Sequence, residues 1–224
     1  MTKTVHSLTT TTTSTPARAA AIGALGFAAG VAVQNLVLLV GMPDASATMA
    51  EAAAWLADNP GRAATASALV GVNLPFLLLF TAAMRALAQH TQAARLWIDL
   101  GSLAVVVLAS TFALVAATQI ASTLLAEAGA TPVFTALWSL HNAAFAMSFP
   151  ALGVTLMGFS IGAHAAGISP AWQRGVGILA ALLLLVAGLA NTAVAGGSPI
   201  IYIGLLGFAL WLLWLVATGV RLLR

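Results

Sequence analysis

The chain has 224 residues, 61% of them hydrophobic and only 6% charged, whereas about a quarter of the residues in a typical soluble domain are charged. So few charges could not cover a soluble globular surface. Uncharged runs of about 20 residues instead predict helices that cross a bilayer. The absence of cysteine excludes disulfides, zinc–thiolate sites and iron–sulfur clusters. Lys and Arg are scattered singly between apolar runs, and this pattern does not indicate a nucleic-acid partner.

The N-terminal region divides into a polar and an apolar part. Residues 1–18 include a threonine run at 9–13, and such low-complexity polar sequence predicts a disordered cytoplasmic tail. The next 25 residues, Ala19 to Pro43, carry no charge and are too long for the apolar region of a cleaved signal peptide. We therefore expect a transmembrane domain over 19–224 that begins with a span at 19–40.

The connection after this span contains an alanine-rich run, which predicts a short helix at 45–57. Asp44 or Ser46 is its expected N-cap, and the sequence Asn59, Pro60, Gly61 is its stop signal. This helix is expected to lie along the external interface or to cover the end of the bundle.

The remaining uncharged runs predict five more spans. Two runs of 46 residues, 128–173 and 175–220, are each longer than one crossing. Gly, His and Pro cluster at 162–170 in the first run and predict a loop, and Gly and Pro at 196–199 predict a turn in the second. The spans are expected at 63–84, 97–126, 132–161, 174–195 and 200–221. The predicted fold is an all-α membrane protein, a bundle of six transmembrane helices with a short external interfacial helix.

Positive charges predict the orientation of this bundle. With six crossings and cytoplasmic termini, seven of the eight Lys and Arg residues fall inside and only Arg62 falls outside. This asymmetry is what the positive-inside rule predicts. We therefore expect a multi-pass protein of the cell membrane with both termini in the cytoplasm.

Several segments resemble a bacterial family of six-helix membrane proteins of unknown function. They are Pro43 to Thr48 after the first span, Leu140-His141, the glycines from Gly153 to Gly162, and the Gly167–Trp172 loop that leads into Gly175–Leu179. The resemblance covers nearly the whole chain and implies a membrane location. It implies no activity, and no functional residues follow from it.

Polar side chains inside the predicted spans are the candidate functional groups, because such groups are expensive in hydrocarbon. Nearly all lie in the outer half of the bundle, and we expect them to converge on one interior cluster. They could line an outward-facing cavity for a small polar ligand, or hydrogen-bond between helices at an average of about 0.6 kcal/mol per pair. The candidates are Asn35, Asn73, Gln119, His141, Asn142 and Asn191.

Catalytic and metal chemistry has little support in the sequence. His141 is the only histidine within a predicted span, and one histidine makes neither a zinc site nor a bis-histidine haem site. No nucleophile, base and acid set is recognisable, so no catalytic residue, metal or cofactor is predicted. Asp99 and Arg95 have the i,i+4 spacing of a helical ion pair, interpreted as structural.

Three functions stay open at this point. The first is non-enzymatic binding of a small molecule, lipid or partner protein through an outward-facing polar cavity. The second is a small transporter or channel, favoured by Pro75 and Pro150 inside spans and disfavoured by the lack of a charge at the midplane. The third is a membrane enzyme without a recognisable motif. The bilayer is the expected partner in each case, and the oligomeric state is not predicted.

Overall fold

The structure is a computed structural model that describes residues 14–43 and 47–224. Within these ranges, six helices are long and apolar enough to cross a membrane, as expected of a multi-pass membrane protein. Two shorter helices, α2 (Met49–Asp58) and α7 (Asn191–Ala195), lie between them. The six long helices are α1 (Thr15–Leu39), α3 (Pro60–Leu87), α4 (Gln92–Glu127), α5 (Thr131–Ala165), α6 (Ala171–Leu189) and α8 (Ile201–Leu222).

The first helix begins earlier than expected. α1 starts at Thr15, so residues 15–18 of the predicted tail are helical, while the tail up to residue 13 lies outside the described residues. Pro16 stands in the first turn, where its missing N–H group has no hydrogen bond to lose and its fixed φ suits the helix.

The helix at the fifth predicted span, 174–195, has different bounds at both ends. The helix starts at Ala171 and ends at Leu189, and residues 191–195 form the separate helix α7. Nineteen residues of helix extend about 28 Å, close to the thickness of a bilayer core. The chain can therefore turn at Ala190, and Asn191 lies on the short helix beyond the span.

The short helix α2 starts later than predicted. It begins at Met49, and its N-cap is Thr48. The Thr48 hydroxyl accepts a hydrogen bond from the Glu51 backbone N–H, and the Glu51 carboxylate accepts one from the Thr48 backbone N–H. This reciprocal capping box requires Thr or Ser three residues before Glu. The expected caps, Asp44 and Ser46, lie outside the described residues.

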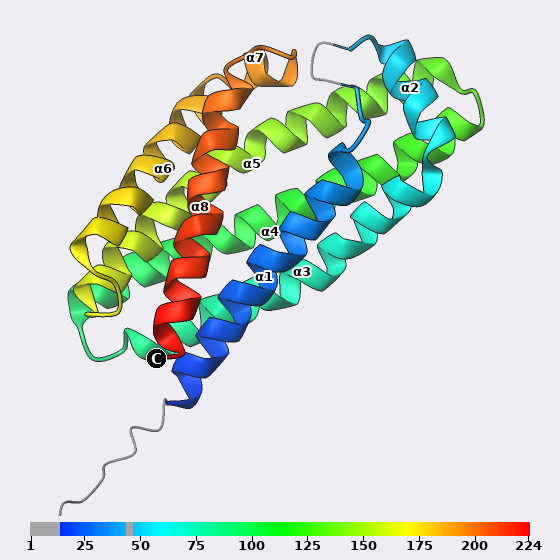
Figure 1. Cartoon of the computed structure of the whole chain (residues 1–224). Helices are drawn as coiled ribbons and strands as arrows, with labels where there is room; N and C mark the ends of the chain where they lie inside the picture. Colours follow the sequence, from blue (N-terminus) through cyan, green and yellow to red (C-terminus); the bar gives the residue numbers. More distant parts are fainter. Residues whose placement is uncertain (1–13, 44–46) are drawn as a thin grey trace, which may run out of the picture.

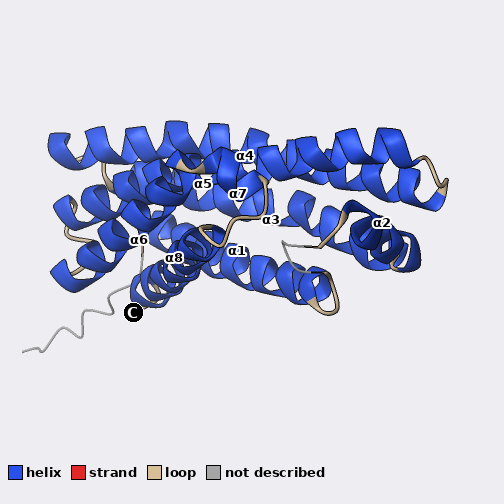
Figure 2. Cartoon of the chain, turned by 90° about the horizontal axis from the view of Figure 1, so that it is seen from above, coloured by secondary structure: helices blue, strands red, loops and turns tan. Residues whose placement is uncertain are grey.

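The six long helices form a ring in chain order. Each packs against its predecessor, in the order α1, α3, α4, α5, α6 and α8, and α8 then packs against α1. In Figure 1, α1 and α8 lie in front of α4. Figure 2 shows α4 on one side of the bundle and α1 and α8 on the other. α1 begins and α8 ends at one end of the ring, here named the termini end. The opposite end, where α2 and α7 lie, is named the α2 end.

Glycines allow neighbouring helices to approach backbone to backbone. A Cβ at Gly158 on α5 would lie 2.6 Å from both the Trp97 carbonyl oxygen and the Gly101 nitrogen of α4. A Cβ at Gly23 on α1 would lie 2.5 Å from the Phe80 nitrogen of α3. Small residues at helix contacts are the usual means of close packing in membranes, where helices gain van der Waals contact by approaching each other.

An aromatic layer fills the ring toward the termini end. Phe80 of α3 contacts Phe159 of α5 and Trp214 of α8, with ring centroids 5.2 and 6.3 Å apart. Phe27 of α1 contacts Trp211 of α8 at 5.1 Å. All five side chains are fully buried. Because α3, α5 and α8 are not neighbours in the ring, the Phe80 contacts cross its interior, and the bundle is solid at this level.

The α2 end has its own small apolar core. Leu56 of α2 and Ala63 of α3 are buried together with Phe134 and Trp138 of α5. α2 thus covers the ends of α3, α4 and α5, which project beyond the rest of the bundle in Figure 1. Its predicted placement over the end of the bundle agrees with this packing.

Arg62, the one positive residue expected outside, caps the end of α1. Its Nε donates a 3.1 Å hydrogen bond to the Val37 carbonyl oxygen in the last turn of that helix. The last carbonyls of a helix have no partner within it and carry partial negative charge, so a guanidinium is well suited to this position. The contact ties the start of α3 to the end of α1.

Candidate functional site

The polar residues of the spans that lie toward the α2 end have partners on different pairs of helices. His141 of α5 lies against α4, where its Nδ1 is 3.1 Å from the Val115 carbonyl oxygen and 3.2 Å from the Thr118 hydroxyl. A carbonyl oxygen only accepts, so Nδ1 carries the proton in this arrangement. The Trp138 ring stacks on the imidazole with centroids 5.1 Å apart. These contacts hold His141 between α4 and the apolar core beneath α2.

The α4 face against which His141 packs is polar and buried, while the opposite face is apolar and exposed. Thr118, Gln119, Ser122 and Thr123 are all less than 9% exposed, whereas Leu124 is 61% exposed. These four polar groups of α4 thus turn inward, as expected for a helix with one face toward lipid.

A second group joins α1 to α3. The Asn73 side-chain amide donates a 2.8 Å hydrogen bond to the Gln34 side-chain oxygen. Asn73 is 2% exposed, and a Cβ at Gly30 would overlap its amide oxygen. The glycine therefore makes room for the buried amide. This pair matches the interpretation in which intramembrane amides connect helices.

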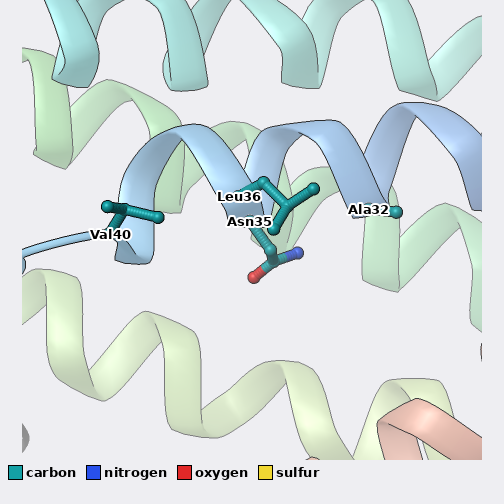
Figure 3. Close-up of a pocket in the computed structure, with 4 residues that line it drawn as sticks. All are labelled: Ala32, Asn35, Leu36 and Val40. Carbon is teal, nitrogen blue, oxygen red and sulfur yellow. The ribbon is translucent and has the colours of Figure 1, made fainter.

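Asn35 is placed differently, because it lines an open cleft. The cleft has a volume of about 440 Å³ and is lined by Ala32, Asn35 and Leu36 of α1 and by Val40, which follows the helix. In Figure 3 the Asn35 side chain points away from α1 toward the yellow-green ribbon of α5. Its amide nitrogen donates a 2.9 Å hydrogen bond to the Val31 carbonyl oxygen of the preceding turn. This bond determines which side-chain atom of Asn35 faces Val31, because only the amide nitrogen can donate to a carbonyl oxygen.

The remaining two candidates lie on α5 and α7. Asn142 is half-buried and follows His141 along α5. The Asn191 amide nitrogen lies 3.2 Å from the Met147 sulfur of α5. No hydrogen bond between described residues joins two of the six predicted site residues. His141 lies at the α4–α5 contact, Asn73 at the α1–α3 contact and Asn191 at the α5–α7 contact, while Asn35 lines the cleft. Convergence of the six residues on one interior cluster stays a prediction.

A buried polar network near the termini end was not anticipated. The Gln173 side-chain nitrogen of α6 donates to the Thr218 hydroxyl of α8 at 2.7 Å and to the Trp214 carbonyl oxygen at 3.2 Å. Gln173 is 1% exposed although it lies between two exposed residues, Trp172 and Arg174. A signal did exist. Gln173 shares the helical face of Gly177, Ala181, Leu184 and Gly188, which the 3.6-residue period assigns to the interior.

The ion pair at the termini end is more extensive than the spacing suggested. Asp99 lies 3.7 Å from Arg95, as predicted, and 2.9 Å from Arg85 of α3. The Arg85 and Arg95 side chains are 58% and 70% exposed. Exposed pairs contribute about 0 to 1 kcal/mol. The pair therefore connects α3 to α4 at the surface and adds little to stability.

Among the described residues, no group of three His, Cys, Asp or Glu side chains could hold a metal ion. No family model matches the chain, and no curated protein or solved structure matches it. The resemblance to the six-helix bacterial family stays a prediction.

Proposed function

We propose that this chain is a cell-membrane protein that binds a small molecule or lipid in the cleft on α1 without catalysing a reaction. The observation that supports this proposal best is Asn35, an amide that points into the cleft, whereas the Asn73 amide bonds to Gln34 and the Asn191 amide contacts Met147. The volume of about 440 Å³ lies within the range of small-molecule sites.

The wall of the cleft is fixed by contacts on the far side of α1. Gln34 is held by Asn73, and the last turn of α1 is held by Arg62. A side chain presented from a rigid helix needs little reordering on binding, which favours affinity. The binding role is therefore better supported than a transport role, for which the aromatic layer would have to open.

Blocking the cleft should abolish binding. Ala32→Trp introduces a large side chain at an exposed position of the lining, so we expect the fold to be retained and the cleft to be filled. Delipidated wild-type protein should gain several degrees in melting temperature when polar and neutral lipid extracts are added, because a ligand that binds only the folded state stabilises it. Ala32→Trp should lose this gain.

Leu103→Trp is the matched control, because Leu103 is 68% exposed on α4 and does not line the cleft. It should respond to lipid as the wild type does. An equal gain in wild type and Ala32→Trp would contradict the proposal, since the stabilisation would then come from the general lipid environment.

The proposed orientation places both termini in the cytoplasm and the α2 end outside, on the basis of the seven inward positive charges. The cysteine-free chain allows a direct measurement with single cysteines. In intact cells, an impermeant thiol reagent should label Ala50→Cys and should label Ser14→Cys only after lysis. Labelling of Ser14→Cys in intact cells would overturn this orientation.

A further inference from the structure

The cleft offers a ligand one polar side chain, and the direction of its amide restricts the ligand. The Asn35 nitrogen donates one of its two N–H groups to the Val31 carbonyl, and the amide oxygen has no hydrogen-bond partner among the described residues. In Figure 3 this oxygen is the side-chain atom that extends farthest from α1 toward α5. An amide oxygen only accepts hydrogen bonds. A ligand that pairs with it must therefore donate one.

The rest of the lining excludes a charged donor. Ala32, Leu36 and Val40 are apolar, and no charged side chain lines the cleft. A charge brought into such surroundings without a partner would lose its hydration with little compensation. An alkylammonium group is charged at neutral pH, whereas a hydroxyl group is neutral and donates. The lining thus favours a hydroxyl on an apolar body.

The position of Asn35 along α1 indicates that the ligand comes from the membrane. Asn35 lies four residues before the end of α1, about 6 Å along the helix axis. With the end of α1 placed at the membrane surface, as in the proposed orientation, this depth is just inside the interface, where the hydroxyl of a neutral lipid resides. Ala32 lies one turn deeper and leaves space for the attached chain. Leu36 and Val40 are 67% and 58% exposed, so the cleft is open to lipid at its side.

On the basis of the proposed binding function, we infer that the cleft takes an uncharged, membrane-resident lipid with a hydroxyl headgroup, which donates a hydrogen bond to the Asn35 amide oxygen while its hydrocarbon chain runs past Ala32. No covalent bond is made or broken in this role.

Three probes with the same chain test the inference. Oleyl alcohol donates a hydrogen bond, oleyl methyl ether only accepts, and oleate is charged. The protein is placed in nanodiscs of dioleoylphosphatidylcholine, which has no hydroxyl donor of its own, and melting temperature is measured against the mole fraction of each probe. Wild type should bind the alcohol about fivefold more tightly than the ether, the effect expected of one hydrogen bond. Oleate should bind least.

Two variants assign this preference to Asn35. Asn35→Leu should bind alcohol and ether equally, because the acceptor is gone. Ser110→Ala should keep the fivefold preference. Ser110 also bonds to a carbonyl of its own helix, Val106, but lies on α4 away from the cleft.

The outcomes separate the two proposals. If alcohol and ether bind wild type equally and Ala32→Trp still blocks both, the hydroxyl inference is overturned while the binding site stands. Tighter binding of oleate than of the alcohol would overturn it as well. If Ala32→Trp responds to lipid extract as the wild type does, the proposed function itself fails.

Discussion

Gly158→Ala should lower the free energy of unfolding by about 3 kcal/mol, the upper end of the usual effect of overpacking. The added methyl would meet two backbone atoms, the Trp97 carbonyl oxygen and the Gly101 nitrogen, each at 2.6 Å. Backbone atoms of a long helix cannot move aside as a flexible side chain can. The α4–α5 contact, the most extensive in the ring, would have to separate. Unfolding in mixed micelles with increasing sodium dodecyl sulfate measures the effect.

Gly71→Ala supplies the control for this prediction. Gly71 is exposed within α3, and a Cβ there would meet nothing within 4 Å. Alanine in a helix interior is favoured over glycine by about 0.5 to 1 kcal/mol, so this variant should be unchanged or slightly more stable. Equal losses in both variants would show that glycine replacement weakens the helices in general, and that the close approach at Gly158 has no special role.

Phe80→Ala should be the second severely destabilising change. Its ring contacts Phe159 and Trp214 across the ring interior, and it is 1% exposed. Substitutions of this type cost about 3 to 5 kcal/mol in soluble cores. In a bilayer the unfolded side chain also rests in hydrocarbon, so the loss of packing dominates and we expect the lower end, about 3 kcal/mol. The same unfolding titration measures it.

Leu78→Ala is matched to Phe80→Ala, because Leu78 lies two residues away on the same helix and is 49% exposed. It should lose less than about 1 kcal/mol, as surface substitutions do. The importance of the aromatic layer would be refuted by a Phe80→Ala variant as stable as Leu78→Ala.

The sequence predicted the helices better than it predicted their neighbours. Uncharged runs and glycine-rich turns are local signals, and they located six long apolar helices to within a few residues except at Ala190. The end of α6 was missed because residues 175–220 contain no charge and Asn191 continues the helical pattern. The Thr48–Glu51 capping box was a local signal that was overlooked.

Partners of the polar residues could not be predicted, because they depend on rotation and contact between helices. Asn73 and His141 are both polar residues within apolar runs, yet Asn73 joins α3 to α1 and His141 joins α5 to α4. Gln34 and Asn35 are adjacent in sequence, and helical geometry directs their side chains about 100° apart, toward α3 and toward the cleft. Only the packed structure shows which of the two side chains faces the cleft.

The chain-order ring also has a consequence for biogenesis. Each long helix can dock onto the one made just before it as the chain leaves the insertion machinery, so five of the six helix contacts need no distant partner. The last contact, between α8 and α1, joins the two ends of the described bundle and must wait for the final helix. α1 carries the cleft, and until α8 is made it has α3 as a neighbour but lacks α8. The ring is therefore closed last, and a chain arrested before α8 would insert and pack most of its helices without closing it.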